Sequence, residues 1–256
     1  MIALLVGLSR RNLIELRRYG FDTFFQFAGI FMLFTLIFWG AKGVGGADIR
    51  EGDTLPAIVV GFVVLSIVLG SFFTTSQWLT QEATLGTLEQ IAISPFGLLR
   101  VLIAESVASL WFLALMTGAM LIGAEAVSGQ WLHLDIVTLT PLIGLLLVQM
   151  VGLSLVVGGA SVVFKRVASL ANLMQFVFLA LVSLPIEDYP AVRYMPIGLA
   201  NQLIRESTVH NVGLFDFNRR DLLQLVLLAS AYFAVGVVVF LRCERVARER
   251  GLIGVH

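Results

Sequence analysis

Charged side chains are scarce in this sequence of 256 residues, and long apolar stretches take their place. Asp, Glu, Lys and Arg make up 13% of the chain, about half of their usual share in a soluble domain, whereas hydrophobic residues make up 58%. Such a chain cannot cover itself with polar surface, which predicts an integral membrane protein. The formal net charge is zero, so the overall charge gives no reason to expect nucleic acid as a partner.

Residues that carry redox or metal chemistry are nearly missing as well. A single cysteine, Cys243, excludes an internal disulfide, and the three histidines are scattered without ligand spacing. We find no G-x-x-x-x-G-K-[ST] loop, no H-E-x-x-H motif and no G-x-S-x-G elbow. We therefore expect no catalytic site, no cofactor and no metal in this chain, and no ATP bound in the P-loop manner. The apolar stretches also lack the acids and histidines typical of a proton-driven pump.

Six apolar runs indicate transmembrane helices, because a charge at the bilayer centre costs about 2.5–3.5 kcal/mol. Each run approaches the roughly 30 Å thickness of the hydrocarbon core at about 1.5 Å per residue. The runs are apolar on every side, which favours helices over barrel strands. We predict one all-α membrane domain over residues 1–256, its third run being charge-free from residue 106. The predicted spans are about 23–41, 55–78, 98–124, 136–164, 167–186 and 222–241.

The basic residues predict the orientation. With the N-terminus inside, eleven of the seventeen Lys and Arg residues fall in cytoplasmic segments and six in outer loops. This asymmetry follows the positive-inside rule. An even number of spans returns the C-terminus to the same side. We therefore expect a multi-pass protein of the cell membrane with both termini cytoplasmic.

Three apolar or small-residue segments have open interpretations. Residues 1–20 place leucines among paired arginines, which favours an N-terminal helix along the cytoplasmic interface over a plain basic tail. The outer segment 187–221 has Pro196 at a possible first helical position and Leu199 and Leu203 on one face, so a re-entrant and a surface amphipathic helix fit equally. In the fourth run, small residues suit close helix packing, internal or across a dimer. They are Ser154, Gly158, Gly159, Ala160 and Ser161.

The cytoplasmic segment 79–100 has the pattern of a short amphipathic helix over residues 81–93. Leu85 and Leu88 share one helical face. Glu82 and Glu89 lie two turns apart and project together. Such a helix at the inner membrane face offers a docking surface for another protein.

The end of this segment predicts the start of the third span. Ser94 cannot comfortably be helical before proline, so we expect it to end the short helix and to cap the next one. Pro95 would then take the first helical position.

This segment resembles the loop after the second span in permeases of ABC-2 type transporters, also called the ABCG-like or type V exporter fold. That loop runs approximately E-x-x-x-G-T-L-E-x-x-x-x-S-P. The residues that match it are Glu82, Gly86, Thr87, Leu88, Glu89, Ser94 and Pro95. The likeness extends to the six-span layout, the turn at 164–166, the apolar outer segment and the basic tail 242–250.

The resemblance implies that this segment is a coupling helix, seated on a separate P-loop ATP-binding subunit in two copies. ATP and Mg²⁺ would bind to that subunit, and a second permease chain, identical or different, would complete the transporter in membrane lipid. The implied partner-binding residues are Glu82, Leu85, Gly86, Thr87, Leu88, Glu89, Gln90, Ser94 and Pro95.

Glu105, near the cytoplasmic start of the third span, departs from the family, in which Lys or Arg is common. An intramembrane acid is a candidate functional residue, but this one lies within about two turns of the interface. A structural role, or a side chain that reaches the interface and its water, is the favoured interpretation.

The expected function is export of an amphipathic, drug-like or lipid-like compound from the cytoplasm or inner leaflet. A polysaccharide or glycolipid exporter of the same family is an alternative, disfavoured because only Trp111 places a tryptophan well inside a span. An ATP-independent secondary transporter is a further alternative, but the paired Gly/Pro-broken spans that it needs are not found.

Overall fold

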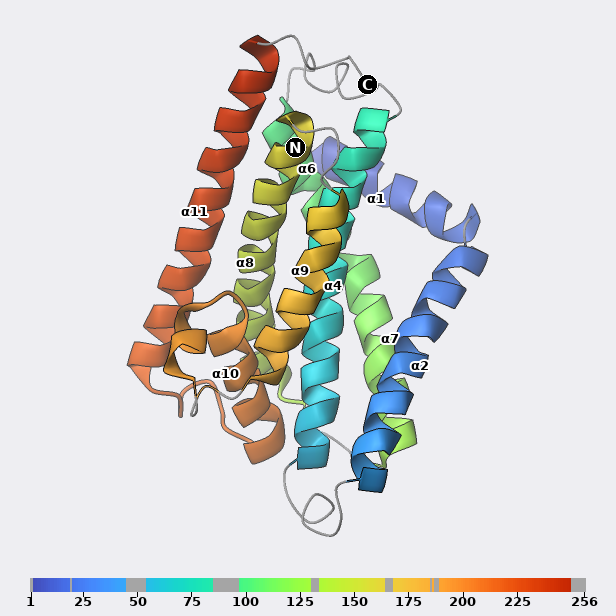
Figure 1. Cartoon of the computed structure of the whole chain (residues 1–256), viewed down its shortest axis with the longest axis vertical. Helices are drawn as coiled ribbons and strands as arrows, with labels where there is room; N and C mark the ends of the chain where they lie inside the picture. The colour runs from blue at the N-terminus through green and yellow to red at the C-terminus, as the bar shows by residue number, and fades with distance from the viewer. Residues whose placement is uncertain are drawn as a thin grey trace.

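The computed structural model describes residues 2–18, 20–44, 54–84, 97–129, 134–163, 168–184, 186 and 189–249. Within these residues the regular structure is entirely helical, which confirms the all-α prediction. Figure 1 shows a bundle of helices that run along its long axis. They are α2 (Gly20–Val44), α4 (Thr54–Thr84), α7 (Leu110–Ser128), α8 (Ile136–Val163), α9 (Ala168–Ser183) and α11 (Arg219–Glu249).

The other four described helices lie at the two ends of the bundle. At one end, called here the α1 end, α1 (Ile2–Arg18) crosses the bundle beside α6 (Leu98–Ala108), and α4 and α11 also end there (Figure 1). At the other end, called the α10 end, the 3-10 helix η1 (Pro190–Tyr194) and α10 (Gly198–His210) fold back against the bundle. The described parts of the segments predicted to be cytoplasmic thus lie at the α1 end.

Among the described residues, four helical stretches are long and apolar enough to cross a membrane. Shorter apolar stretches lie in α2 and α9, at Ala28–Gly40 and Ala171–Ser183. The described parts of the six predicted spans are largely helical, and the six-span layout itself stays a prediction. The four long candidates are Leu55–Thr74, Leu98–Ser128, Ile136–Val163 and Arg219–Glu249.

The helix α6 begins at Leu98, which agrees with the start of the predicted third span at residue 98. Gly97 before it adopts φ 72° and ψ 156°, a conformation that is not helical and is nearly restricted to glycine. The predicted cap Ser94 and first helical position Pro95 lie outside the described residues. The span is interrupted at Ser109, whose hydroxyl donates a hydrogen bond to the Ser106 carbonyl oxygen at 3.0 Å. At the end of α4, residues 81–84 continue this long helix rather than beginning a separate one.

The most extensive helix contact in the described part of the chain is between α8 and α11, which pack side by side over much of their length at one edge of the bundle (Figure 1). A Cβ atom added to Gly152 would lie 2.5 Å from the Tyr232 carbonyl oxygen, and one added to Gly159 would lie 3.1 Å from the Phe240 Cα. Glycine lets the two backbones approach to this distance. Of the small residues predicted to pack closely, Gly159 lies in this contact and Ser154 and Gly158 are buried, whereas Gly152 was not among the predicted residues.

The outer segment packs into the core of the bundle. Leu199 and Leu203 share a buried face of α10, as predicted. The helix begins at Gly198 and not at Pro196, because Ile197 before it has φ 81° and cannot be helical. The Ile197 backbone N–H donates to the Gln149 side-chain oxygen of α8 at 3.2 Å, which secures the turn. The apolar face of α10 is thus covered by protein, whereas its relation to the bilayer stays a prediction.

Candidate functional site

The predicted coupling segment falls mostly outside the described residues. This holds for Leu85, Gly86, Thr87, Leu88, Glu89, Gln90, Ser94 and Pro95. Two of the predicted site residues, Glu82 and Glu105, are described, and both lie at the α1 end of the bundle. They are 7% and 3% exposed, which is unusual for glutamate and calls for a partner for each carboxylate.

Glu82 lies in the last turn of α4 and is bound by α1. The Arg11 Nη1 atom donates a hydrogen bond to Glu82 Oε1 at 3.1 Å, and the two side chains form an ion pair. A charge-assisted hydrogen bond of this kind compensates in part for taking a carboxylate out of water. Within the chain, Glu82 therefore ties the end of α4 to α1. Contact of Glu82 with a separate subunit stays a prediction.

Glu105 lies on α6 and is bound by the next residue of α1. The Asn12 Nδ2 atom donates to Glu105 Oε1 at 3.0 Å. The Glu105 side chain is 3% exposed, so the described helices cover it, and its position relative to the membrane interface stays a prediction. The structural interpretation agrees with this geometry, because Glu105 joins α6 to α1.

Together these four side chains form a polar clamp, defined here as Arg11, Asn12, Glu82 and Glu105. Two consecutive residues of α1 hold acids from two helices that are 71 and 93 residues away in the sequence. The predicted coupling segment leaves α4 two residues after Glu82. A displacement of that segment would therefore act directly on α4 and, through the clamp, on α1 and α6. The arrangement suits mechanical connection between helices.

Arg11 and Asn12 are the members of this clamp that sequence reasoning did not identify. Arg11 counted only as one of the basic residues that set orientation. The available signal was the polar run Arg-Arg-Asn within an otherwise leucine-rich helix. Buried acids elsewhere in the chain need hydrogen-bond donors, and this run contains them. Which acid meets which donor depends on how α1 crosses the bundle.

Among the described residues, no group of three or more His, Cys, Asp or Glu side chains lies close enough together to hold a metal ion. A comparison of the sequence with models of protein families and with curated proteins finds no match.

We expect the Arg11–Glu82 pair to contribute about 1–2 kcal/mol to stability in a double-mutant cycle with alanine at each position. Exposed pairs give about 0.2–1 kcal/mol, but the Glu82 side chain is only 9% exposed, and hydrogen bonds to charged groups reach about 1.5–3 kcal/mol. Thermal unfolding in detergent measures the coupling.

The matched control is the Arg248–Glu244 pair of α11, which lies one helical turn apart, with Arg248 52% exposed. Its coupling should be about 0.3–0.5 kcal/mol. Equal coupling energies for the two pairs would show that the clamp is an ordinary surface contact.

Proposed function

We propose that this chain is the membrane-spanning permease subunit of an ATP-driven exporter of the ABC-2 type, with six spans and both termini cytoplasmic. The observation that carries the proposal is the motif that begins at Glu82 and continues through Gly86-Thr87-Leu88-Glu89 to Ser94-Pro95, directly after a long apolar helix. A partner with a P-loop must supply the energy, because the chain lacks that loop. The proposed cargo is an amphipathic or lipid-like compound, in keeping with the apolar surface of the spans.

In this proposal the coupling segment docks on the ATPase and the polar clamp passes its movement to the bundle. Glu82 is engaged by Arg11, so we assign the main charged contact with the ATPase to Glu89. A push on the segment would move the end of α4, and the clamp would carry α1 and α6 with it. Rigid helices joined by satisfied buried polar contacts transmit such displacements better than loosely packed ones.

The purified chain alone should hydrolyse no ATP, because no phosphate-binding loop is present. Co-expression with a P-loop ATPase encoded beside it should yield a complex with ATPase activity that responds to an exported amphiphile. A malachite-green phosphate assay on both preparations makes the comparison. The control is the same complex with its ATPase Walker A lysine replaced by alanine. Robust hydrolysis by this chain alone would refute its assignment as a membrane subunit.

A further inference from the structure

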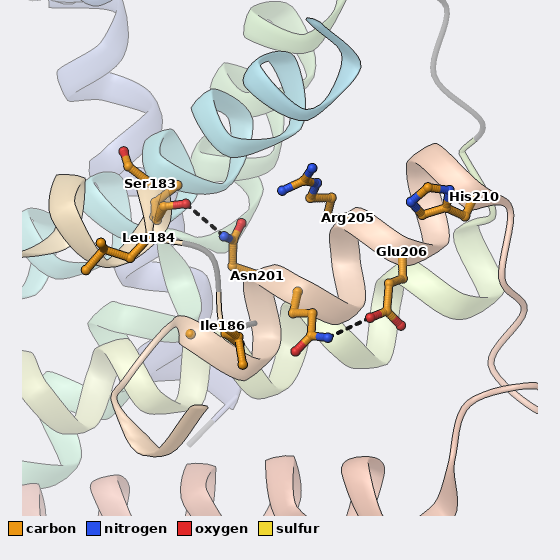
Figure 2. A pocket seen from close by; sticks show the side chains of 10 residues that line it. Ser183, Leu184, Ile186, Asn201, Arg205, Glu206 and His210 are labelled. Atoms are coloured by element: carbon orange, nitrogen blue, oxygen red, sulfur yellow. Dashed lines mark hydrogen bonds between the residues drawn. The ribbon is translucent and has the colours of Figure 1, made fainter. Parts of the chain in front are cut away.

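Two neighbouring cavities at the α10 end share one arginine. The first, called the apolar cavity, has a volume of about 320 Å³ and lies between α2, α4 and α9. The second, called the polar pocket, has a volume of about 220 Å³ and lies along α10 (Figure 2). Val182, Ser183 and Arg205 line both. An apolar space and a polar space that meet at a cation are complementary to an amphiphile, which has an apolar part and a polar part.

The Arg205 guanidinium makes no hydrogen bond or ion pair with any residue that the structure describes. Figure 2 shows its side chain extending from α10 away from Glu206, whose carboxylate accepts a hydrogen bond from Gln202 Nε2 at 2.8 Å. The apolar cavity that Arg205 lines is also lined by residues of α2 and α9 and by α4 residues between 57 and 65, within the apolar stretch Leu55–Thr74. The exposed Arg205 side chain therefore lies beside the first turns of a candidate membrane span. An arginine beside an apolar cavity favours an anionic partner.

The polar pocket also presents hydrogen-bond acceptors without donors. Asn201 Nδ2 donates to the Val182 carbonyl oxygen at 3.0 Å, which leaves Asn201 Oδ1 buried and unpartnered. Gln202 Nε2 is engaged by Glu206, and Gln202 Oε1 is likewise buried and unpartnered. Buried acceptors are normally satisfied, so these two oxygens call for donors on a bound molecule. The pocket thus favours a ligand that carries an anionic group together with hydroxyl or amine donors.

The mouth of the apolar cavity opens on the outside of the bundle. Ile37 of α2 and Leu179 of α9 line it and are 42% and 39% exposed. The helix α4 contacts both of these helices (Figure 1), and its residues also line the cavity. Since this surface faces the hydrocarbon when the helices span a bilayer, the occupant would enter from the membrane.

We propose that the two cavities together bind one glycerophospholipid of the bilayer. Its phosphate pairs with the Arg205 guanidinium, whose planar fork matches phosphate oxygens in a bidentate manner. Donors of the headgroup bond to Asn201 Oδ1 and Gln202 Oε1, and an acyl chain fills the apolar cavity. The proposal depends on insertion into a membrane and is independent of coupling to ATP.

The test uses the full chain, purified and delipidated in dodecyl maltoside. Phosphatidylglycerol and diacylglycerol with the same acyl chains are titrated, and bound lipid is counted by native mass spectrometry. The wild type should bind phosphatidylglycerol about ten- to a hundredfold more tightly than diacylglycerol, as expected for a well-formed charge-assisted hydrogen bond. Phosphatidylcholine, whose headgroup has no donor, should bind more weakly than phosphatidylglycerol.

Arg205→Gln should abolish the preference for phosphatidylglycerol, and Arg220→Gln should leave it unchanged. Arg220 is an exposed arginine of α11 that lines neither cavity. Ala57→Leu, which narrows the apolar cavity, should weaken the binding of both lipids. Thermal unfolding checks that each variant folds. If Arg205→Gln does not fold, Arg205→Lys replaces it and should bind phosphatidylglycerol with intermediate affinity.

Three outcomes would overturn the proposal. Equal lipid affinity in the Arg205 and Arg220 variants would remove the role of Arg205. Displacement of the lipid by millimolar inorganic phosphate would identify a simple anion site. A loss of dimer mass in Arg205→Gln with unchanged lipid retention would show that the cavities are covered by a second copy of the chain.

Discussion

Gly236→Ala will lower the free energy of unfolding by about 1–3 kcal/mol, although alanine is the better helix former by up to about 1 kcal/mol. An added Cβ atom would overlap the Gly152 carbonyl oxygen, and the backbone of Gly152 surrounds it on the same side. A backbone oxygen cannot rotate away as a flexible side chain can. The two helices would have to separate along the α8–α11 contact, so the packing loss exceeds the gain in propensity. Thermal unfolding in detergent, followed by circular dichroism, measures the effect.

Gly144→Ala is the matched control, because Gly144 lies on α8 and an added Cβ atom there meets nothing within 4 Å. This variant should be neutral or slightly more stable, through helix propensity alone. If Gly236→Ala matched it in stability, the close packing of α8 and α11 would be contradicted.

Gly86→Trp and Glu89→Arg will each reduce export sharply while leaving expression and membrane insertion intact. In the proposed function, the coupling helix sits in a groove of the ATPase, where Gly86 permits close approach and Glu89 makes a charged contact. A tryptophan would hold the helix away from the groove wall. Reversing the charge of Glu89 would remove a charge-assisted hydrogen bond of about 1.5–3 kcal/mol, which corresponds to about ten- to a hundredfold weaker docking on the ATPase. Retention of the ATPase in a pull-down and efflux of a fluorescent amphiphile from cells report the two effects.

Two controls separate docking from a general effect of the substitutions. Gly40→Trp adds the same side chain at an exposed glycine of α2 where nothing lies within 4 Å, and Glu249→Arg reverses a charge at the exposed end of α11. Both should retain wild-type export. If Gly86→Trp and Glu89→Arg also exported normally, segment 79–100 would be a solvated connector, and the strongest local support for the family would be lost.

Sequence reasoning located the helices well and their ends less well. Charge-free runs predicted residues 136–164 and 55–78, and α8 and the apolar part of α4 occupy these positions. The start of α6 at Leu98 agrees with the predicted span 98–124, and the positive φ of Gly97 explains why the helix begins there. The first position of α10 was missed because the rule for proline is local, whereas the positive φ of Ile197 delays the helix to Gly198.

The candidate site was only half predictable. Glu82 stood out through the motif of segment 79–100 and Glu105 as an acid near the start of an apolar run, and both are buried. Their donors Arg11 and Asn12 did not stand out in the sequence, because α1 reaches the two glutamates only once the chain has folded. Nothing in the sequence distinguishes Arg205 from other residues of the outer segment. Only the packing of α10 places it beside α4 and α9.

By itself the sequence determined the helical class and the positions of the apolar helices, because both depend on the hydrophobicity of consecutive residues and the cost of burying charge. The tertiary structure decided which distant groups meet: Arg11 with Glu82, Gly152 with Gly236, and Arg205 with two cavities. These contacts join residues 71 or more positions apart or residues from several helices. They depend on how rigid helices cross and rotate against one another, and no local pattern of residues encodes that geometry.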